Sequence, residues 1–256
     1  MDVEQPPPIL EFDPTHTAIL EPHGPKVEGP ISERGVLCFF QEVLQQLVED
    51  GRLKTIGWLI SEIGPNPVYE MTEQGEPLVV VHPGVGAPLA AGFMEELITV
   101  GVRKFIVCGG CGVLEPEIIA GHPVILTSAI RDEGTSYHYL PPGREVSADP
   151  QAISALELTF SEHNLPYRLS KSWTTDGIYR ETVARRASRL EEGCEVVEME
   201  AAAFFAVAQF RKVKCGQVVY GGDLVHPEGW DARSWNDLKS DRQLLFWLAV
   251  EACLRL

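Results

Sequence analysis

Basic residues are scarce in this chain of 256 residues, which contains 21 lysines and arginines against 37 aspartates and glutamates and has a formal net charge of −16. A surface with this excess of negative charge disfavours binding to nucleic acid and to anionic membranes. No apolar run approaches the length of about 20 residues that a membrane-spanning helix needs, and the N-terminus lacks a signal-peptide pattern. We therefore expect a cytoplasmic protein whose partners include neither nucleic acid nor a membrane.

Several motifs of nucleotide and metal chemistry are also absent. Neither of the two glycine-rich stretches has the Walker spacing or the Gly-x-Gly-x-x-Gly pattern, which disfavours the nucleotide-binding folds that use them. The six cysteines are scattered through apolar surroundings, and the pair Cys108 and Cys111 has no second pair with which to bind zinc. The sequence thus predicts buried, reduced thiols, no metal site and no cofactor.

Apolar segments with strand character alternate with segments of helical periodicity along most of the chain. The expected strands cover residues 17–20, 55–60, 68–71 (after a turn at 65–67), 78–81, 104–108, 123–127, 167–172, 196–197 and 217–220. The expected helices include one that begins at Ser32 and covers 38–48, and others at 152–163, 179–190, 201–209 and 241–254. The pattern predicts a single α/β domain at residues 15–256, with a mixed, mainly parallel central sheet flanked by helices, after an extended N-terminal arm at residues 1–14.

The segment 195–209 places carboxylates at a predicted junction between a strand and a helix. Two valines suit a strand, the residues Glu198, Met199 and Glu200 follow, and a run rich in alanine and phenylalanine favours a helix. Open α/β sheets bind ligands outside the carboxyl ends of their strands, so these side chains are candidates for a binding site. Capping of the helix N-terminus by a carboxylate is the alternative interpretation.

Glycine-containing loops are predicted to follow four strands, at residues 21–24, 84–88, 109–112 and 221–223. A doubly wound sheet can gather such loops along one edge. Glycine lets a ligand approach the backbone and leaves N–H groups free to bind an anion, so the candidate anion contacts are Gly86, Gly109 and Gly110.

Several segments together resemble the nucleoside phosphorylase superfamily, which includes uridine phosphorylase, purine nucleoside phosphorylase and the adenosylhomocysteine-type nucleosidases. The segments that carry the resemblance are residues 84–88 (Gly-Val-Gly-Ala-Pro), 108–112 (Cys-Gly-Gly-Cys-Gly), 174–179 (Thr-Thr-Asp-Gly-Ile-Tyr), 197–201 (Val-Glu-Met-Glu-Ala) and 221–223 (Gly-Gly-Asp). Residues 129–139 are most similar to the uridine phosphorylase branch. The resemblance implies a pentosyltransferase that cleaves the N-glycosidic bond of a small-molecule (deoxy)ribonucleoside, nominally by phosphorolysis to free base and ribose 1-phosphate. It also implies a homo-oligomer, either a dimer or a hexamer.

The same resemblance assigns roles to individual residues. Glu200 would accept hydrogen bonds from the ribose hydroxyls, Met199 would pack on the sugar, and Glu198 would be a supporting carboxylate. Asp223 matches the family's acid, which protonates or hydrogen-bonds the leaving base, and a turn or cap aspartate is the alternative. Arg233 is the candidate for the arginine that pairs with this acid, with a surface salt bridge as the alternative.

The candidate base contacts are Thr175, Ile178 and Arg180. Ile178 stands where the family has an aromatic residue, so its contact with the base would be aliphatic. Arg180 is close enough in sequence to reach base carbonyl groups, and a solvated arginine at a helix start is the alternative.

The phosphate-binding half of the family pattern is altered. Residues 20–24 stand where the family has a phosphate loop, and they lack its glycine and its arginine; residues 107–110 lack a second arginine and a hydroxyl. Loss of these cations removes charge-assisted hydrogen bonds to phosphate. Three alternatives follow: phosphorolysis with phosphate as co-substrate, hydrolysis with Glu21 as the base, or a nucleoside-binding homologue without catalysis.

Overall fold

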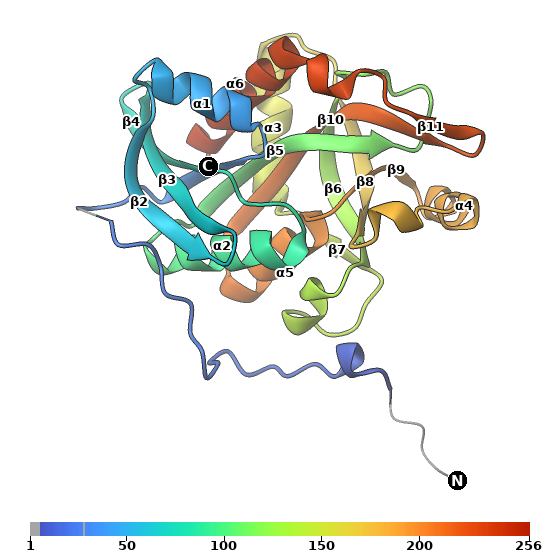
Figure 1. Cartoon of the computed structure of the whole chain (residues 1–256), viewed down its shortest axis with the longest axis horizontal. Helices are drawn as coiled ribbons and strands as arrows, with labels where there is room; N and C mark the ends of the chain where they lie inside the picture. The colour runs from blue at the N-terminus through green and yellow to red at the C-terminus, as the bar shows by residue number, and fades with distance from the viewer. Residues whose placement is uncertain (1–5, 28) are drawn as a thin grey trace.

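Within residues 6–27 and 29–256, which the computed structural model describes, eleven strands form one mixed sheet (Figure 1). Its path runs β11-β10-β6-β8-β9-β5-β1-β4-β3-β2, and β7 pairs with β6. The strands are β1 (Arg34–Cys38), β2 (Lys54–Ser61), β3 (Gly64–Glu73), β4 (Glu76–Val81), β5 (Lys104–Val113), β6 (Pro123–Asp132), β7 (Glu145–Ser147), β8 (Arg168–Thr175), β9 (Cys194–Glu198), β10 (Lys214–His226) and β11 (Gly229–Asp231). The predicted mixed α/β sheet is confirmed.

Five of these strands close on one another and bring the candidate site together. β5 pairs in parallel with β10 and, at its carboxyl end, antiparallel with β9, where Gly112 is in register with Val197. β10 also pairs with β6, and β8 lies between β6 and β9. The carboxyl ends of β5 and β9 therefore meet beside the later part of β10.

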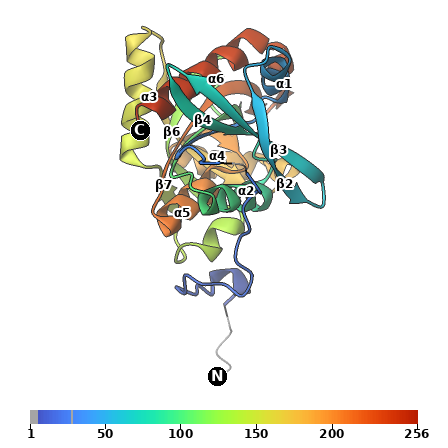
Figure 2. The same cartoon turned by 90° about the vertical axis from the view of Figure 1, so that its left-hand side faces the viewer.

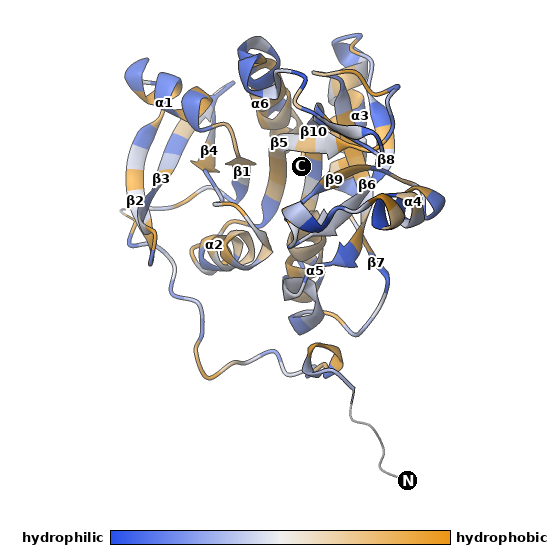
Figure 3. Ribbon diagram, turned by 45° about the vertical axis from the view of Figure 1, so that its right-hand side comes forward, coloured by the Kyte–Doolittle hydropathy of each residue, from blue (hydrophilic) through white to orange (hydrophobic). Residues whose placement is uncertain are grey.

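Helices cover both faces of the sheet (Figures 1 and 2). One face carries α2 (Ala87–Thr99) and α5 (Ala201–Arg211), and the other carries α1 (Gln41–Glu49), α3 (Pro150–Glu162) and α6 (Lys239–Leu254). Helix α4 (Val183–Glu191) lies against β9. Figure 3 shows apolar strands β1, β4 and β5 between these layers, with polar residues on the outward side of α1 and α4. In the part of the chain that the structure describes, no helix is long and apolar enough to cross a bilayer.

The structure contradicts two predictions about the N-terminal part. Residues 17–20 form no strand, and Ile19 and Leu20 are exposed. The helix predicted from Ser32 is also wrong at its start, because the chain first forms β1 between β4 and β5, and α1 begins only at Gln41. The run Val36-Leu37-Cys38 is buried in the middle of the sheet, and periodicity cannot distinguish such a short apolar run from a buried helix.

Three predicted loops also lie inside strands. The turn expected at residues 65–67 belongs to β3, and the hairpin instead turns at Glu62 and Ile63. The glycine loop expected at 109–112 belongs to β5, and the one expected at 221–223 belongs to β10, whose pairing with β5 shifts register there. Among the described residues of 11–33 there is no helix or strand, and residues 1–5 of the predicted arm lie outside the described part of the chain. The arm boundary at residue 14 stays a prediction.

Candidate active site

A cavity of about 690 Å³ lies beside the carboxyl ends of β9 and β10. Residues from four regions line it: β5, the turn before α4, the β9–α5 junction, and the β10–β11 hairpin with the turn that follows it. They are Gly112, Ile178, Tyr179, Glu181, Val197, Glu198, Met199, Asp223, Val225, Trp230 and Trp235. The cavity thus brings together Glu198, Met199 and Asp223, which the sequence predicted to share a site.

Glu198 caps the N-terminus of α5. Its Oε2 accepts hydrogen bonds from the backbone N–H groups of Glu200 (2.7 Å) and Ala201 (2.6 Å). Its Oε1 accepts from the hydroxyls of Ser172 (2.9 Å) and Thr174 (2.5 Å) of β8. A carboxylate has about four lone-pair sites, and these donors occupy all of them. Burial raises the pKa of Glu198, while the four donors oppose that shift. The capping interpretation is therefore correct for Glu198.

Glu200 keeps acceptor capacity that Glu198 lacks. Its Oε1 accepts from the backbone N–H of Gly86 (2.6 Å), and its Oε2 accepts from that of Met199 (3.3 Å). Two of its roughly four lone-pair sites stay open to further donors such as sugar hydroxyls. Burial, with the neighbouring charge of Glu198 second, raises the pKa of Glu200 to about 8. Glu200 follows Met199, which lines the cavity, directly in the chain and is itself almost fully buried.

Asp223 is hydrogen-bonded by an indole rather than by an arginine. Its Oδ2 accepts from Trp230 Nε1 at 2.7 Å. The guanidinium of Arg233 instead donates to the carbonyl oxygens of Ile118 (2.6 Å) and Pro116 (3.5 Å). The predicted pairing of Arg233 with Asp223 is wrong, because the carbonyl groups of the segment after β5 take the arginine.

The predicted base contacts separate into two groups. Ile178 lines the cavity, whereas Thr175 is buried at the end of β8 and accepts from the N–H of Gly177 (3.1 Å). Arg180 is exposed and is not part of the cavity wall. Trp230 and Trp235, which come from a distant part of the chain, add aromatic surface to the same cavity.

Glu21 does not belong to this site. It is exposed, its Oε1 accepts from the N–H of Ala18 (2.7 Å), and it lines a second, larger cavity of about 950 Å³ between the N-terminal segment and α2. None of Glu198, Met199 and Asp223 lines that cavity. The prediction of Glu21 as a catalytic base is therefore wrong for this cavity. The physical reason is that residues 21–24, contrary to the prediction from the sequence, do not follow a strand of the sheet. They precede β1, and the turn that does follow β1 begins at Phe39.

The three predicted anion contacts have other partners. Gly86, with φ at +92°, precedes α2 and gives its N–H to Glu200. Gly109 and Gly110 are in register with β10 inside the sheet. A Cβ added at Gly109 would lie 2.9 Å from Phe39 Cδ2, so an aromatic ring packs directly on this backbone. Among the residues that line the 690 Å³ cavity there is no lysine or arginine.

Glu181 is a cavity residue that the sequence motifs did not indicate. It is half-buried in the turn that leads into α4. Burial, followed by the negative charge of Asp223, raises its pKa to about 7. The signal was missed because Glu181 follows the recognised segment 174–179 and reaches Asp223 only through the tertiary fold.

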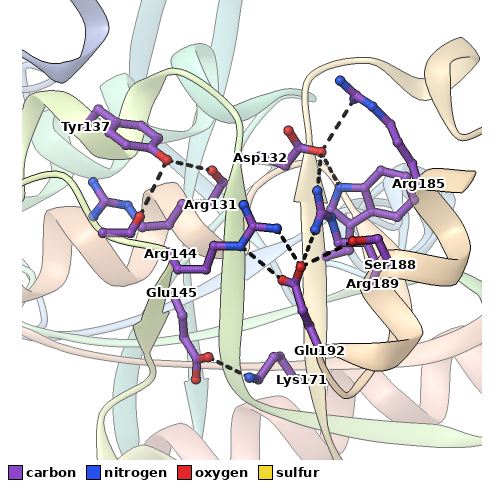
Figure 4. A network of polar contacts seen from close by, with 12 residues as sticks. Arg131, Asp132, Tyr137, Arg144, Glu145, Lys171, Arg185, Ser188, Arg189 and Glu192 are labelled. Atoms are coloured by element: carbon purple, nitrogen blue, oxygen red, sulfur yellow. Dashed lines mark hydrogen bonds and ion pairs between the residues drawn. The ribbon is translucent and has the colours of Figure 1, made fainter. Parts of the chain in front are cut away.

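Two sets of contacts hold α4 and therefore this wall of the cavity. Arg186 Nε donates to the carbonyl oxygen of Val225 (2.7 Å), and its Nη2 donates to that of Leu114. Figure 4 shows Arg185 and Arg189 of α4 directed at Asp132 of β6, with N–O distances of 3.5 Å and 3.6 Å. Helix α4 is thus tied to the strands on both sides of it.

The thiols and the possible metal ligands form no further site here. All six cysteines are buried and unpaired, as predicted. Within the described ranges, no group of three or more His, Cys, Asp or Glu side chains is arranged to hold a metal ion.

A family model described as "Phosphorylase superfamily" matches residues 33–243, which is most of the chain. The chain belongs to the phosphorylase superfamily. A guanosine phosphorylase of Halorubrum lacusprofundi is 28% identical to it over 184 residues, which are 69% of this chain and 76% of the relative. A uridine phosphorylase of Treponema pallidum is 32% identical over 154 residues, 56% of this chain and 60% of the relative.

The fold comparison agrees with the family. The crystal structure of a purine nucleoside phosphorylase from Toxoplasma gondii in complex with immucillin-H matches with a TM-score of 0.75 and 18% identity, covering 88% of this chain and 92% of that one. This likeness shows the fold. The predicted family and the predicted status as an enzyme are confirmed, whereas the homo-oligomer and the cytoplasmic location stay predictions.

Proposed function

We propose that this phosphorylase-superfamily member cleaves the N-glycosidic bond of a nucleoside and transfers the sugar to water. The observation that carries the proposal is the cavity in which Met199 and the β9–α5 junction lie together with Asp223 and two indoles, with no basic residue among the cavity-lining residues. The sequence relatives named as guanosine and uridine phosphorylases support a nucleoside as the substrate.

The sugar is held at the β9–α5 junction. The open lone pairs of Glu200 can accept the ribose hydroxyls, and the flexible side chain of Met199 can pack on the ring. Cleavage of the bond develops positive charge on the sugar, and the carboxylates around the cavity stabilise that charge most where water is excluded. Because Glu198 is already satisfied by four donors, its role is to hold this junction in place.

The base lies between aromatic and aliphatic surfaces. Trp230 and Trp235 can stack on a planar base, and Ile178 adds an apolar contact. Asp223, held by Trp230, is a hydrogen-bonding partner for the base.

Water is favoured over phosphate as the acceptor for electrostatic reasons. A phosphate dianion would enter a cavity lined by three acidic side chains (Glu181, Glu198 and Asp223) without a lysine or arginine among the lining residues. Of the glycines predicted to bind it, Gly86 donates its N–H to Glu200, and Gly109 and Gly110 lie within the pairing of β5 with β10. Phosphorolysis is the second candidate, and the names of the relatives favour it.

A nucleoside panel tests the proposal. The purified protein is incubated with purine and pyrimidine nucleosides, with and without inorganic phosphate, and the products are separated as free base, ribose and ribose 1-phosphate. We expect the products to be free base and free ribose, released at the same rate with and without phosphate. Formation of ribose 1-phosphate only when phosphate is present would instead establish phosphorolysis. Thermal stabilisation by a nucleoside without any product would support a binding protein.

A further inference from the structure

The cavity holds three carboxyl groups in three different environments. Glu198 accepts four hydrogen bonds, and Asp223 accepts one from the indole of Trp230. Among the described residues no hydrogen-bond donor contacts the carboxyl group of Glu181, which is half-buried in the same cavity wall. Donors stabilise the ionised form of a carboxyl group, and their absence in a half-buried position favours the protonated form. The surroundings of Glu181 therefore favour its protonated form.

We propose that Glu181 is the general acid that gives its proton to the departing base. This inference rests on the proposed function. It replaces the acid role that the sequence resemblance assigned to Asp223. A carboxyl group whose surroundings favour its protonated form is the usual proton donor for acid catalysis at neutral pH.

The fold holds Glu181 and Asp223 in the wall of the same cavity. Thr182 caps α4 by accepting from the N–H of Arg185 (3.3 Å), which fixes the backbone directly after Glu181. Arg186 ties the same helix to Val225, two residues after Asp223. The other titratable side chains that line the cavity with Glu181 are Asp223 of β10, Glu198 of β9 and Tyr179 of the preceding turn. Arg186 points away from it toward two carbonyl oxygens.

The protonation state fits the role. Burial and the adjacent Asp223 charge raise the pKa of Glu181 to about 7, so about half of the molecules carry the proton at neutral pH. In the reaction the bond between the sugar carbon and the base nitrogen breaks, its electron pair passes to the base, and Glu181 protonates the base. Water adds to the sugar carbon and releases one proton to solvent, from which Glu181 is protonated again. Atoms and charge therefore balance.

The test compares two leaving groups. A nucleoside needs its base to be protonated, whereas 4-nitrophenyl riboside releases a stable phenolate that needs no proton. Glu181→Gln should lower kcat on the nucleoside by about 10²–10⁴-fold, the usual contribution of a general acid, and change kcat on the nitrophenyl substrate by less than about threefold. Glu191→Gln, an exposed glutamate at the end of α4, is the matched control and should leave both rates unchanged.

The pH profile gives a second readout on the unaltered protein. Activity on the nucleoside should fall as the pH rises through about 7, because Glu181 loses its proton there, and activity on the nitrophenyl substrate should lack this limb. An equal loss of both activities in Glu181→Gln, or the same alkaline limb with both substrates, would overturn the acid role. Absence of any nucleoside cleavage by the unaltered protein would overturn the proposed function itself, and the acid role with it.

Discussion

Replacement of Glu198 tests whether this carboxylate holds the β9–α5 junction. In Glu198→Ala the N–H groups of Glu200 and Ala201 lose their acceptor in a region that is almost fully buried. Each buried unsatisfied donor costs about 1–3 kcal/mol, and the lost side-chain volume adds to that, so we expect destabilisation by roughly 4 kcal/mol or more. Thr174 keeps one partner, because its hydroxyl also accepts from the N–H of Ala202 (3.0 Å).

Glu198→Gln should be much milder. Its remaining carbonyl oxygen can still accept from both N–H groups, and its amide can donate to the hydroxyls of Ser172 and Thr174 after they rotate. What is lost is the negative charge at the helix N-terminus and the charge assistance of the hydrogen bonds, together about 1–2 kcal/mol.

Urea denaturation followed by circular dichroism measures both variants. The matched control is Glu195→Ala on the same strand, which removes a partly exposed ion pair with Arg168 (2.9 Å) and should cost at most about 1 kcal/mol. Equal losses of unfolding free energy in Glu198→Ala and Glu198→Gln would refute the assignment of the larger loss to the N–H groups left without an acceptor. A cost of Glu198→Ala no larger than that of the control would show that the junction does not depend on this cap.

Two further predictions concern the neighbouring groups. The pKa of Glu200 is about 8 in the folded protein and about 4.5 in the unfolded chain, so the folded state keeps a proton that the unfolded state releases, and stability falls as the pH rises from about 4.5 to about 8. Glu200→Gln removes this dependence on pH. The difference in unfolding free energy, variant minus unaltered protein, should therefore rise by a few kcal/mol between pH 5 and pH 9. A difference that stays constant across that range would contradict the raised pKa of Glu200. Trp230→Phe keeps an aromatic surface but removes the indole N–H that donates to Asp223 Oδ2 at 2.7 Å, so Asp223 loses the hydrogen bond that orients it and kcat/KM should fall about tenfold. An unchanged kcat/KM in a stably folded Trp230→Phe would show that the indole does not act through Asp223.

Local patterns in the sequence were sufficient for the family, the mixed sheet and the β9–α5 junction. Short apolar strands and the run after Glu200 are determined by residues close to one another in the chain, so periodicity and helix propensity could predict them. The grouping of Met199 with Asp223 was also predicted, because the recognised segments carry it.

Only the tertiary structure decided what each polar side chain does there. Glu198 is held in place as a cap because Ser172 and Thr174 of β8 donate hydrogen bonds to its carboxylate. Arg233 does not pair with Asp223 because its guanidinium donates instead to the carbonyl oxygen of Ile118 at 2.6 Å. These partners are separated from the residues they contact by about 24 to 115 positions, and no local pattern encodes such contacts.

The same reason explains the residues that were missed or misplaced. Glu181 meets Asp223, and Phe39 packs on Gly109, only when the sheet closes. Trp230 reaches Asp223 through the hairpin of β10 and β11, which the sequence patterns did not predict. Glu21 lines a different cavity because it precedes the first strand. The sequence by itself determined which residue types are available for nucleoside chemistry. The packing of distant segments decided which of them line the cavity and which are satisfied by other groups.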